Sequence, residues 1–444
     1  MLKGQFPVEK FASLRTPFYY YDLPLLRRTL DKIRECIEPY PQFHVHYAVK
    51  ANFNARILEE ISSRGFGADC VSGGEVRVAL QNGFAPKSIV YAGVGKSDEE
   101  ILLALDAGIA RFNVESAAEL EVINELAISR GVVAPVSLRV NPDIGAHTHA
   151  NITTGLAENK FGINYEQLPG VIELADSLPG VEYKGLHFHI GSQILEMDDF
   201  VALCNRINVL AEQILRQRRG RLVPAASSAA AVGYSSSAVG SAGVSGSGVA
   251  AGVAGAAGAV GSGAVAGAAA GVAGAAASVL GDINVGGGLG INYYHPNHLD
   301  VAEFSQYFET FARHLKLPEG TPVHFELGRS VVAPCGSLIS RVLYIKEGTT
   351  RRFAIIDASM TELIRPALYK AYHRVENISS YEPEEVYDVV GPVCESSDVF
   401  AKGVSIDKCH RGDFIAIRSA GAYGESMSSQ YNCRPLPACF FKED

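Results

Sequence analysis

Two hydrophobic patterns alternate along most of this chain. Short apolar or alternating stretches predict β-strands, and segments whose apolar residues recur every three or four positions predict amphipathic helices. Between residues 44 and 330 there are eight strand-like stretches: HVHYAVK (44–50), GADCVS (67–72), SIVYAG (88–93), RFNVES (111–116), VSLRVNP (136–142), YKGLHFHIGS (183–192), DINVGGG (282–288) and HFELGRS (324–330). Helical patterns lie between most of them, clearest at 24–37, 55–63, 74–81, 98–107 and 117–130. The alternation predicts an α/β fold, a TIM-type (β/α) barrel of eight strands.

The end of the chain has a different pattern. Four strand-like stretches occur there without long helices between them: RVLYIKEG (341–348), RRFAIIDAS (351–359), VYDVVGP (386–392) and DFIAIRSAG (413–421). They predict a mostly β second domain, and the stretch PFYYYDL at 17–23 is a further strand for it. We therefore predict a barrel over residues 24–332 and a β-domain made of residues 1–23 and 333–444.

A low-complexity insertion at about 221–280 interrupts the predicted barrel. Between 225 and 279 it contains almost only Ala, Gly, Val and Ser, with Tyr234 as the exception. Its glycines and serines make a poor membrane helix, so we expect no membrane association. A flexible excursion, an engineered insertion and a placeholder for unassigned sequence all fit this composition.

Composition excludes some classes of function. The chain has 444 residues, 47% of them hydrophobic, which is enough for two cores. Its net charge of -9 disfavours non-specific binding to nucleic acid. The eight cysteines form no CxxC pair and the twelve histidines form no HExxH motif, so we expect reduced thiols and no metal site. Because the N-terminal residues lack the apolar core of a signal peptide, we expect a cytoplasmic protein.

The first barrel strand delivers a lysine, Lys50, to its end. Such a lysine either extends to solvent or holds its amine in a pocket, where a lowered pKa would make it a Schiff-base nucleophile. Polar residues and glycines follow other strands at the same end: Asp69, Arg139, Asn141, His187, His189, Ser192, Gly286, Gly287, Gly288, Glu326 and Arg329. In a TIM-type barrel this end carries the chemistry, and phosphate sites lie beyond strands seven and eight.

A reactive lysine and a phosphate site together suggest pyridoxal 5'-phosphate. The glycine run after strand seven leaves room for backbone amides to approach a phosphate, although a tight turn explains it too. Glu326 is a candidate partner for the pyridine nitrogen, and the alternative is a local salt bridge with Arg329. His189 is a candidate to stack on the cofactor ring, and the alternative is a core histidine with satisfied hydrogen bonds.

Seven motifs in order give the chain a family resemblance. They are YAVKAN (47–52), HFHIGSQ (187–193), GGGLGI (286–291), ELGRS (326–330), LIRPALY (363–369), CESSD (394–398) and GAYG (421–424). The set resembles the diaminopimelate decarboxylase family, whose members are barrel-fold, pyridoxal-phosphate-dependent enzymes. The resemblance implies decarboxylation of meso-2,6-diaminopimelate to L-lysine.

The resemblance also implies residue roles. Lys50 would hold the cofactor covalently, with Asp69 nearby, His189 on the ring and Glu326 at the ring nitrogen. The phosphate would be held by Ser192, Gly286, Gly287, Gly288 and Tyr423. Arg329, Arg365 and Tyr369, with Tyr423, would bind the substrate carboxylate that is kept. Cys394 would act as an acid and Glu395 would bind a substrate ammonium, both from the partner subunit of a homodimer.

Several alternatives stay open at this point. Taken singly, Cys394 fits a small buried hydrophobe, Tyr423 a core aromatic and Arg365 a surface ion-pair partner. Leu327 stands where the family usually has proline, and Ser359 where it usually has a glycine that could require positive φ. The stretch 141–161 resembles a substrate-facing loop that could close over the site. The alternative activities are decarboxylation of ornithine, lysine or carboxynorspermidine, or a non-catalytic regulator that binds the cofactor.

Overall fold

A computed structural model describes residues 6–142, 160–222, 279–296 and 301–443. Most of the low-complexity insertion and of the stretch 141–161 therefore lies outside the described residues. Within the described ranges, no helix combines the length and apolar character that crossing a membrane requires.

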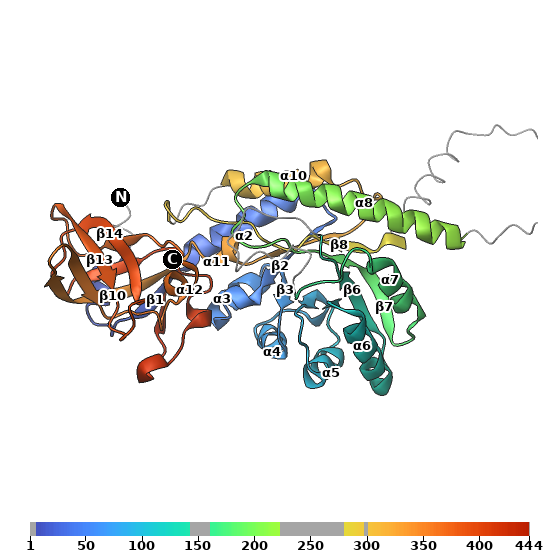
Figure 1. The fold of residues 1–444 in the computed structure, drawn as a ribbon, viewed down its shortest axis with the longest axis horizontal. Coiled ribbons are helices and arrows are strands. Elements are labelled where there is room, and N and C mark those ends of the chain that lie inside the picture. The colour runs from blue at the N-terminus through green and yellow to red at the C-terminus, as the bar shows by residue number, and fades with distance from the viewer. Residues whose placement is uncertain (1–5, 143–159, 223–278, 297–300, 444) are drawn as a thin grey trace, which may run out of the picture.

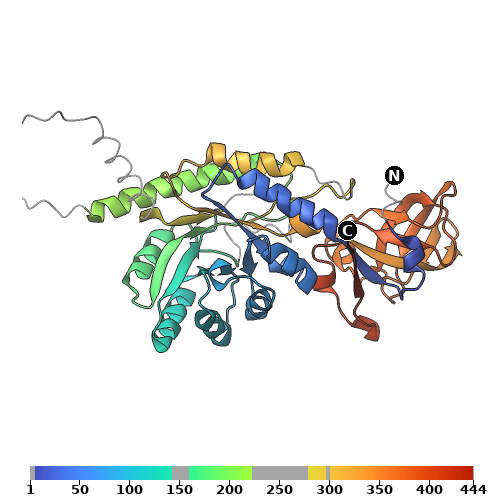
Figure 2. The same cartoon turned by 180° about the vertical axis from the view of Figure 1, so that it is seen from behind.

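Eight parallel strands close into a barrel in the order β2-β3-β4-β5-β6-β7-β8-β9, which confirms the predicted fold class. Their bounds are β2 Phe43–Ala48, β3 Gly67–Cys70, β4 Ile89–Tyr91, β5 Arg111–Val114, β6 Ala134–Arg139, β7 Val181–His187, β8 Asp282–Asn284 and β9 Val323–Leu327. Figures 1 and 2 show the helices on the outside of this barrel. They are α2 Leu23–Ile37, α3 Ala55–Ser62, α4 Gly73–Gln81, α5 Asp98–Ala107, α6 Ala117–Arg130, α7 Leu168–Ser177, α8 Met197–Leu222 and α10 Val301–His314.

Local sequence explains where helix α2 begins and which face it buries. Asp22 caps α2, because its carboxylate accepts a hydrogen bond from the Leu25 amide at 2.9 Å, and Pro24 occupies the first turn. The buried face of α2 contains Leu26 and Leu30, as its periodicity predicted.

The second part of the molecule is a largely antiparallel sheet of eight strands, seen at the other end from the barrel in Figure 1. Its strands are β1 Phe18–Asp22, β10 Gly336–Glu347, β11 Arg352–Ile356, β12 Val375–Asn377, β13 Glu384–Val390, β14 Val399–Asp407, β15 Phe414–Ile417 and β16 Ala438–Lys442. The N-terminal strand β1 pairs with β10 and β16, as predicted, so distant parts of the chain share one sheet.

The sequence did not predict three strands of this sheet, β12, β14 and β16. Strands β12 and β16 are short, and β14 contains Lys402 and Gly403 among its apolar residues. The predicted domain boundaries stay a prediction.

Three short helices complete the fold: α1 Val8–Phe11, α11 Arg329–Val332 and α12 Arg365–Tyr369. Leu327 ends β9, buried and paired with Tyr47, so leucine fits there. Ser359 is buried without a positive φ, and its hydroxyl donates to Glu362 at 2.9 Å. Neither departure from the family pattern disturbs the local backbone.

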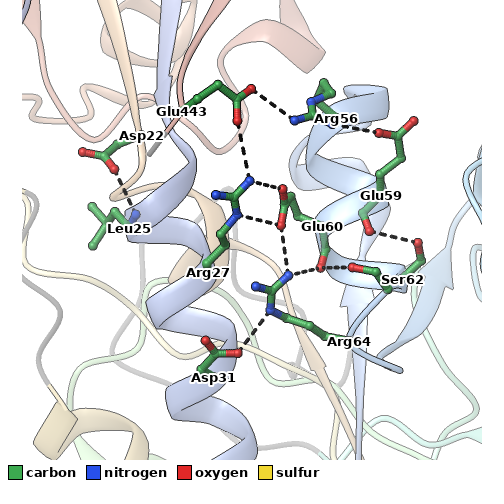
Figure 3. A network of polar contacts seen from close by, with 11 residues as sticks. Asp22, Leu25, Arg27, Asp31, Arg56, Glu59, Glu60, Ser62, Arg64 and Glu443 are labelled. Atoms are coloured by element: carbon green, nitrogen blue, oxygen red, sulfur yellow. Dashed lines mark hydrogen bonds and ion pairs between the residues drawn. The ribbon is translucent and has the colours of Figure 1, made fainter.

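An ion-pair network joins the chain's C-terminal end to the barrel helices (Figure 3). Arg27 of α2 contacts Glu60 of α3 at 2.7 Å, and Glu60 also accepts from Arg64 at 2.9 Å. Glu443, which follows β16, lies 3.1 Å from Arg56 and 3.6 Å from Arg27. Because Glu443 is exposed, solvent screens each of its ion pairs. The network links the residue after β16 to α2 and α3 and adds little to stability.

Candidate active site

A cavity of about 450 Å³ opens at the carboxyl end of the barrel. Most of the predicted site residues line it: Lys50, Asp69, His189, Ser192, Gly288, Glu326, Arg329, Arg365, Tyr369 and Tyr423. They come from both parts of the molecule, so the cavity depends on the contact between barrel and sheet. Four predicted residues do not line it: Gly286, Gly287, Cys394 and Glu395.

Lys50 lies just beyond its strand, in a short 3-10 turn at Val49–Ala51. The backbone amide of Tyr423 donates to the Ala51 carbonyl at 2.7 Å, which places this tyrosine of the second domain beside the lysine. Asn52 supports the same contact, because its side chain donates to the Gly421 carbonyl at 2.9 Å. The end of the YAVKAN motif thus joins the two parts of the molecule at the site.

The Lys50 amine forms an ion pair with Asp69 at 3.5 Å, and its side chain is 38% exposed, so a ligand in the cavity can reach it. Burial by itself would lower the pKa of Lys50, but the neighbouring acids, Asp69 foremost, raise it above its ordinary value. The expectation of a lowered pKa is therefore wrong, because the site surrounds the ammonium with acidic groups. At neutral pH Lys50 carries its proton.

Asp69 is almost completely buried, and neither of its oxygens has a hydrogen-bond partner among the described residues. Burial and the nearby Glu326 raise the pKa of Asp69, while Lys50 opposes this shift. A buried carboxylate without hydrogen bonds is costly unless a ligand or a proton satisfies it. Asp69 is therefore poised both to accept a proton and to contact a bound group.

Glu326 lies inside β9 and is held by three side chains. Asn284 and Asn113 donate to one carboxylate oxygen at 2.7 and 3.3 Å, and His187 lies 3.1 Å from the other. Burial alone would raise the pKa of Glu326, but His187, with Lys50, holds it well below its ordinary value. Glu326 is thus an ionised acceptor inside the barrel. The alternative salt bridge with Arg329 is wrong, because Arg329 contacts other groups.

His189 lines the cavity beyond the end of β7, half-buried. Burial, followed by the cations Arg139 and Lys50, lowers the pKa of His189 well below its ordinary value. The Gly287 amide donates to its Nδ1 at 3.3 Å, which fixes the ring orientation. A neutral, fixed imidazole at the cavity wall suits stacking on a flat ring.

The glycine run has a packing role that sequence reasoning missed. A Cβ atom on Gly287 would lie 1.9 Å from the Glu326 carbonyl oxygen, and one on Gly286, whose φ is 72°, would lie 2.3 Å from the Phe188 carbonyl oxygen. These two glycines allow the chain after β8 to pass close to its neighbours. Gly288 alone of the three lines the cavity.

Two buried arginines, Arg329 and Arg365, line the cavity and share one hydrogen-bond acceptor. Arg329, at the start of α11, donates to Ser192 Oγ at 2.9 Å, and its guanidinium lies 5.0 Å from the Tyr423 ring. Arg329 and Arg365 each donate to the Tyr293 hydroxyl at 2.8 Å. Because Arg365 is only 5% exposed, its reading as a surface ion-pair partner is wrong.

The structure adds residues to which sequence reasoning gave no role. Arg139 lines the cavity and donates to Glu115 at 2.7 Å, and Glu115 also accepts from the Gly162 amide at 2.7 Å. Through Glu115, the end of β6 is therefore linked to the backbone of Gly162. Asn113 and Asn284, which donate to Glu326, could have been predicted as its partners, because each is a polar residue flanked by apolar residues in its strand-like stretch.

Cys394 and Glu395 lie between β13 and β14, both exposed. Glu395 accepts a hydrogen bond from the Tyr431 hydroxyl at 2.7 Å. The reading of Cys394 as a buried hydrophobe is therefore wrong.

Residues 26–218 match the model of a family described as "Pyridoxal-dependent decarboxylase, pyridoxal binding domain". The barrel, the cavity lysine and this match define the class of the protein as a barrel-fold, pyridoxal-phosphate-dependent decarboxylase. A diaminopimelate decarboxylase of Bacteroides thetaiotaomicron is 51% identical over 443 residues, covering 100% of both chains, and one from Zymomonas mobilis is 35% identical over 96% of this chain and 87% of its own. The crystal structure of the Helicobacter pylori enzyme complexed with L-lysine aligns with a TM-score of 0.80 at 33% identity, covering 98% of this chain and 94% of that one. The chain belongs to the diaminopimelate decarboxylase family.

Proposed function

We infer that this protein decarboxylates meso-diaminopimelate to L-lysine and carbon dioxide with pyridoxal phosphate as cofactor. The observation that carries the inference is one cavity in which Lys50 lies with an ionised Glu326 and two buried arginines. An amine, an acceptor for a ring nitrogen and a carboxylate-binding pair are what cofactor and substrate require of the protein.

The cavity residues fit the cofactor. Asp69, whose oxygens have no hydrogen-bond partner among the described residues, offers a proton acceptor, the neutral His189 ring a stacking surface, and the ionised Glu326 a partner for a pyridinium nitrogen. We propose that Ser192, Gly288 and Tyr423, with the neighbouring glycines, hold the phosphate. Bound pyridoxal phosphate supplies an electron sink for the electron pair left when carbon dioxide departs.

The protein's own groups do the remaining work. Lys50 must lose its proton before its amine can bond to a carbonyl carbon, and Asp69 at 3.5 Å is the adjacent acceptor. Glu326 would hold a proton on the ring nitrogen. Arg329, Arg365 and Tyr369 would bind the carboxylate that the reaction keeps, which places the other carboxyl group at the cofactor.

The test of this function uses the purified protein, pyridoxal phosphate and a panel of substrates. The expected result is release of carbon dioxide and L-lysine from meso-diaminopimelate, with little turnover of ornithine, lysine or carboxynorspermidine, because the two arginines need a distal carboxylate. Turnover of ornithine but not of diaminopimelate would assign the protein to another decarboxylase of this class. A visible imine absorbance with no carbon dioxide from any substrate would indicate a regulator.

We also propose that the protein is a homodimer with shared active sites. The support is that exposed Cys394 and Glu395 carry the family motif yet do not line the cavity of their own chain. In a symmetric dimer each cavity can receive these residues from the other subunit. Cytoplasmic location stays a prediction.

Mixed dimers test this arrangement. Lys50→Ala and Cys394→Ser are each expected to be nearly inactive alone. After the two variants are unfolded together and refolded, about a quarter of wild-type activity is expected, because half of the dimers would contain one intact site. If the mixture stays as inactive as its components while its subunits exchange, each chain supplies its own Cys394 and the proposal is wrong.

A further inference from the structure

Tyr293 follows the glycine motif by two residues and lies between the two arginines of the site. It is 8% exposed, and its hydroxyl oxygen is the common acceptor for Arg329 and Arg365, each at 2.8 Å. The Arg365 guanidinium also lies 5.5 Å from the Tyr293 ring centroid. One phenol thus sets the separation of two cations that come from different helices.

The hydrogen-bonding capacity of a phenol makes this arrangement informative. Its oxygen has two acceptor positions and one proton. Both acceptor positions are used by the arginines, so the proton is left for a further acceptor. A carboxylate bound by Arg329 and Arg365 would lie within reach of that proton.

The surroundings hold the Tyr293 ring in place. His373 packs against it edge to face, with ring centroids 5.1 Å apart, and His373 Nδ1 lies 2.9 Å from the Arg418 carbonyl oxygen. Burial by itself would raise the pKa of Tyr293, but Arg329 and Arg365 outweigh burial and lower it below its ordinary value. A more acidic phenol is a stronger hydrogen-bond donor to an anion.

We propose that Tyr293 is a substrate-positioning residue that holds Arg329 and Arg365 as one carboxylate-binding pair and donates its hydroxyl proton to the carboxylate they bind. The proposal rests on the proposed function, because the ligand of the pair is the carboxylate that the reaction keeps. It adds a further hydrogen bond to that recognition, from a residue outside the motifs that resemble the family.

The test compares Tyr293→Phe with Tyr294→Phe in the cofactor-loaded protein. Tyr294 is the matched control, because it is the next residue, is exposed and stacks on Tyr372 with ring centroids 4.4 Å apart. Tyr293→Phe is expected to raise KM for diaminopimelate about tenfold with kcat within about twofold, since it removes a hydrogen bond to a charged group used equally in ground and transition states. Tyr294→Phe should leave both constants unchanged.

Binding of two ligands, L-lysine and cadaverine, distinguishes a loss of carboxylate recognition from a general disruption of the site. L-lysine keeps the carboxylate in question, and cadaverine is the same molecule without it. Calorimetry should show that Tyr293→Phe weakens L-lysine binding about tenfold and leaves cadaverine binding unchanged. Equal weakening of both ligands, or of neither, would overturn the proposal.

The same measurements distinguish failure of the role proposed for Tyr293 from failure of the proposed enzymatic function. If the wild-type protein releases no lysine from diaminopimelate but Tyr293→Phe selectively weakens L-lysine binding, the function is wrong and the role of Tyr293 stands. If the wild-type protein is active and Tyr293→Phe matches it in KM and in L-lysine binding, only the role of Tyr293 is wrong.

Discussion

Replacing Lys50 with alanine is expected to lower the rate of diaminopimelate decarboxylation on the order of 10⁴-fold or more, as loss of a covalent nucleophile does in other enzymes. The amine is the cavity group that can bond to the cofactor. Among the described residues that line the cavity, the other cationic side chains are guanidiniums, which cannot replace it. The measurements are carbon dioxide release and the visible absorbance of the protein after pyridoxal phosphate is added.

Lys50→Arg is the matched control for charge. Arginine keeps a cation beside Asp69 and Glu326, so it preserves the electrostatic balance of the cavity, but its guanidinium stays protonated and forms no stable imine. Both variants are expected to be inactive, with Lys50→Arg the more stable fold. Substantial activity in Lys50→Arg would show that the lysine acts through its charge and would refute covalent attachment.

Replacing Glu326 with glutamine is expected to lower kcat on the order of 10²- to 10³-fold, comparable with removal of a single electrostatic group from other active sites. Glutamine keeps the size of the side chain and removes its charge, so a proton on the cofactor ring nitrogen loses its ionised partner. KM should change much less, because Glu326 does not contact the arginine pair. Steady-state kinetics with saturating cofactor measures both constants.

A control is needed because Glu326 is buried and hydrogen-bonded. Glu119→Gln also neutralises a largely buried carboxylate, one that pairs with Lys96 at 2.5 Å and does not line the cavity. It should lower thermal stability while leaving kcat of the folded protein unchanged. If the two variants lose stability and kcat in parallel, Glu326 serves the fold rather than the reaction.

The sequence predicted the barrel well because its signals are local. Alternating and apolar stretches revealed each of the strands β2 to β9 within a few residues, and the N-terminal strand was recognised from its aromatic run. The strands that were not predicted have weaker local signals. Strand β12 is only three residues long, and β16 is part of the sheet because it pairs in parallel with β1. Such pairing depends on contacts between residues far apart in the chain.

The site was predicted in composition better than in detail. Contiguous motifs identified Lys50, His189 and Glu326, and one cavity brings them together. The glycine run was interpreted as a phosphate site. In the structure, Gly286 and Gly287 must be glycine because neighbouring backbone atoms approach too closely to leave room for a Cβ atom. That approach cannot be read from a motif, because it depends on where the chain beyond β7 and strand β9 pass in space.

By itself, the sequence determined the barrel, the second sheet with its N-terminal strand, and the family, because each is encoded in local periodicity or in contiguous motifs. Only the tertiary structure decided that Lys50 is protonated, that His187 and two asparagines hold Glu326, and that Tyr293 bridges the arginines. The physical reason is that hydrogen bonds and charge interactions depend on distances of a few ångströms between side chains from separate elements, and the packing of those elements sets these distances.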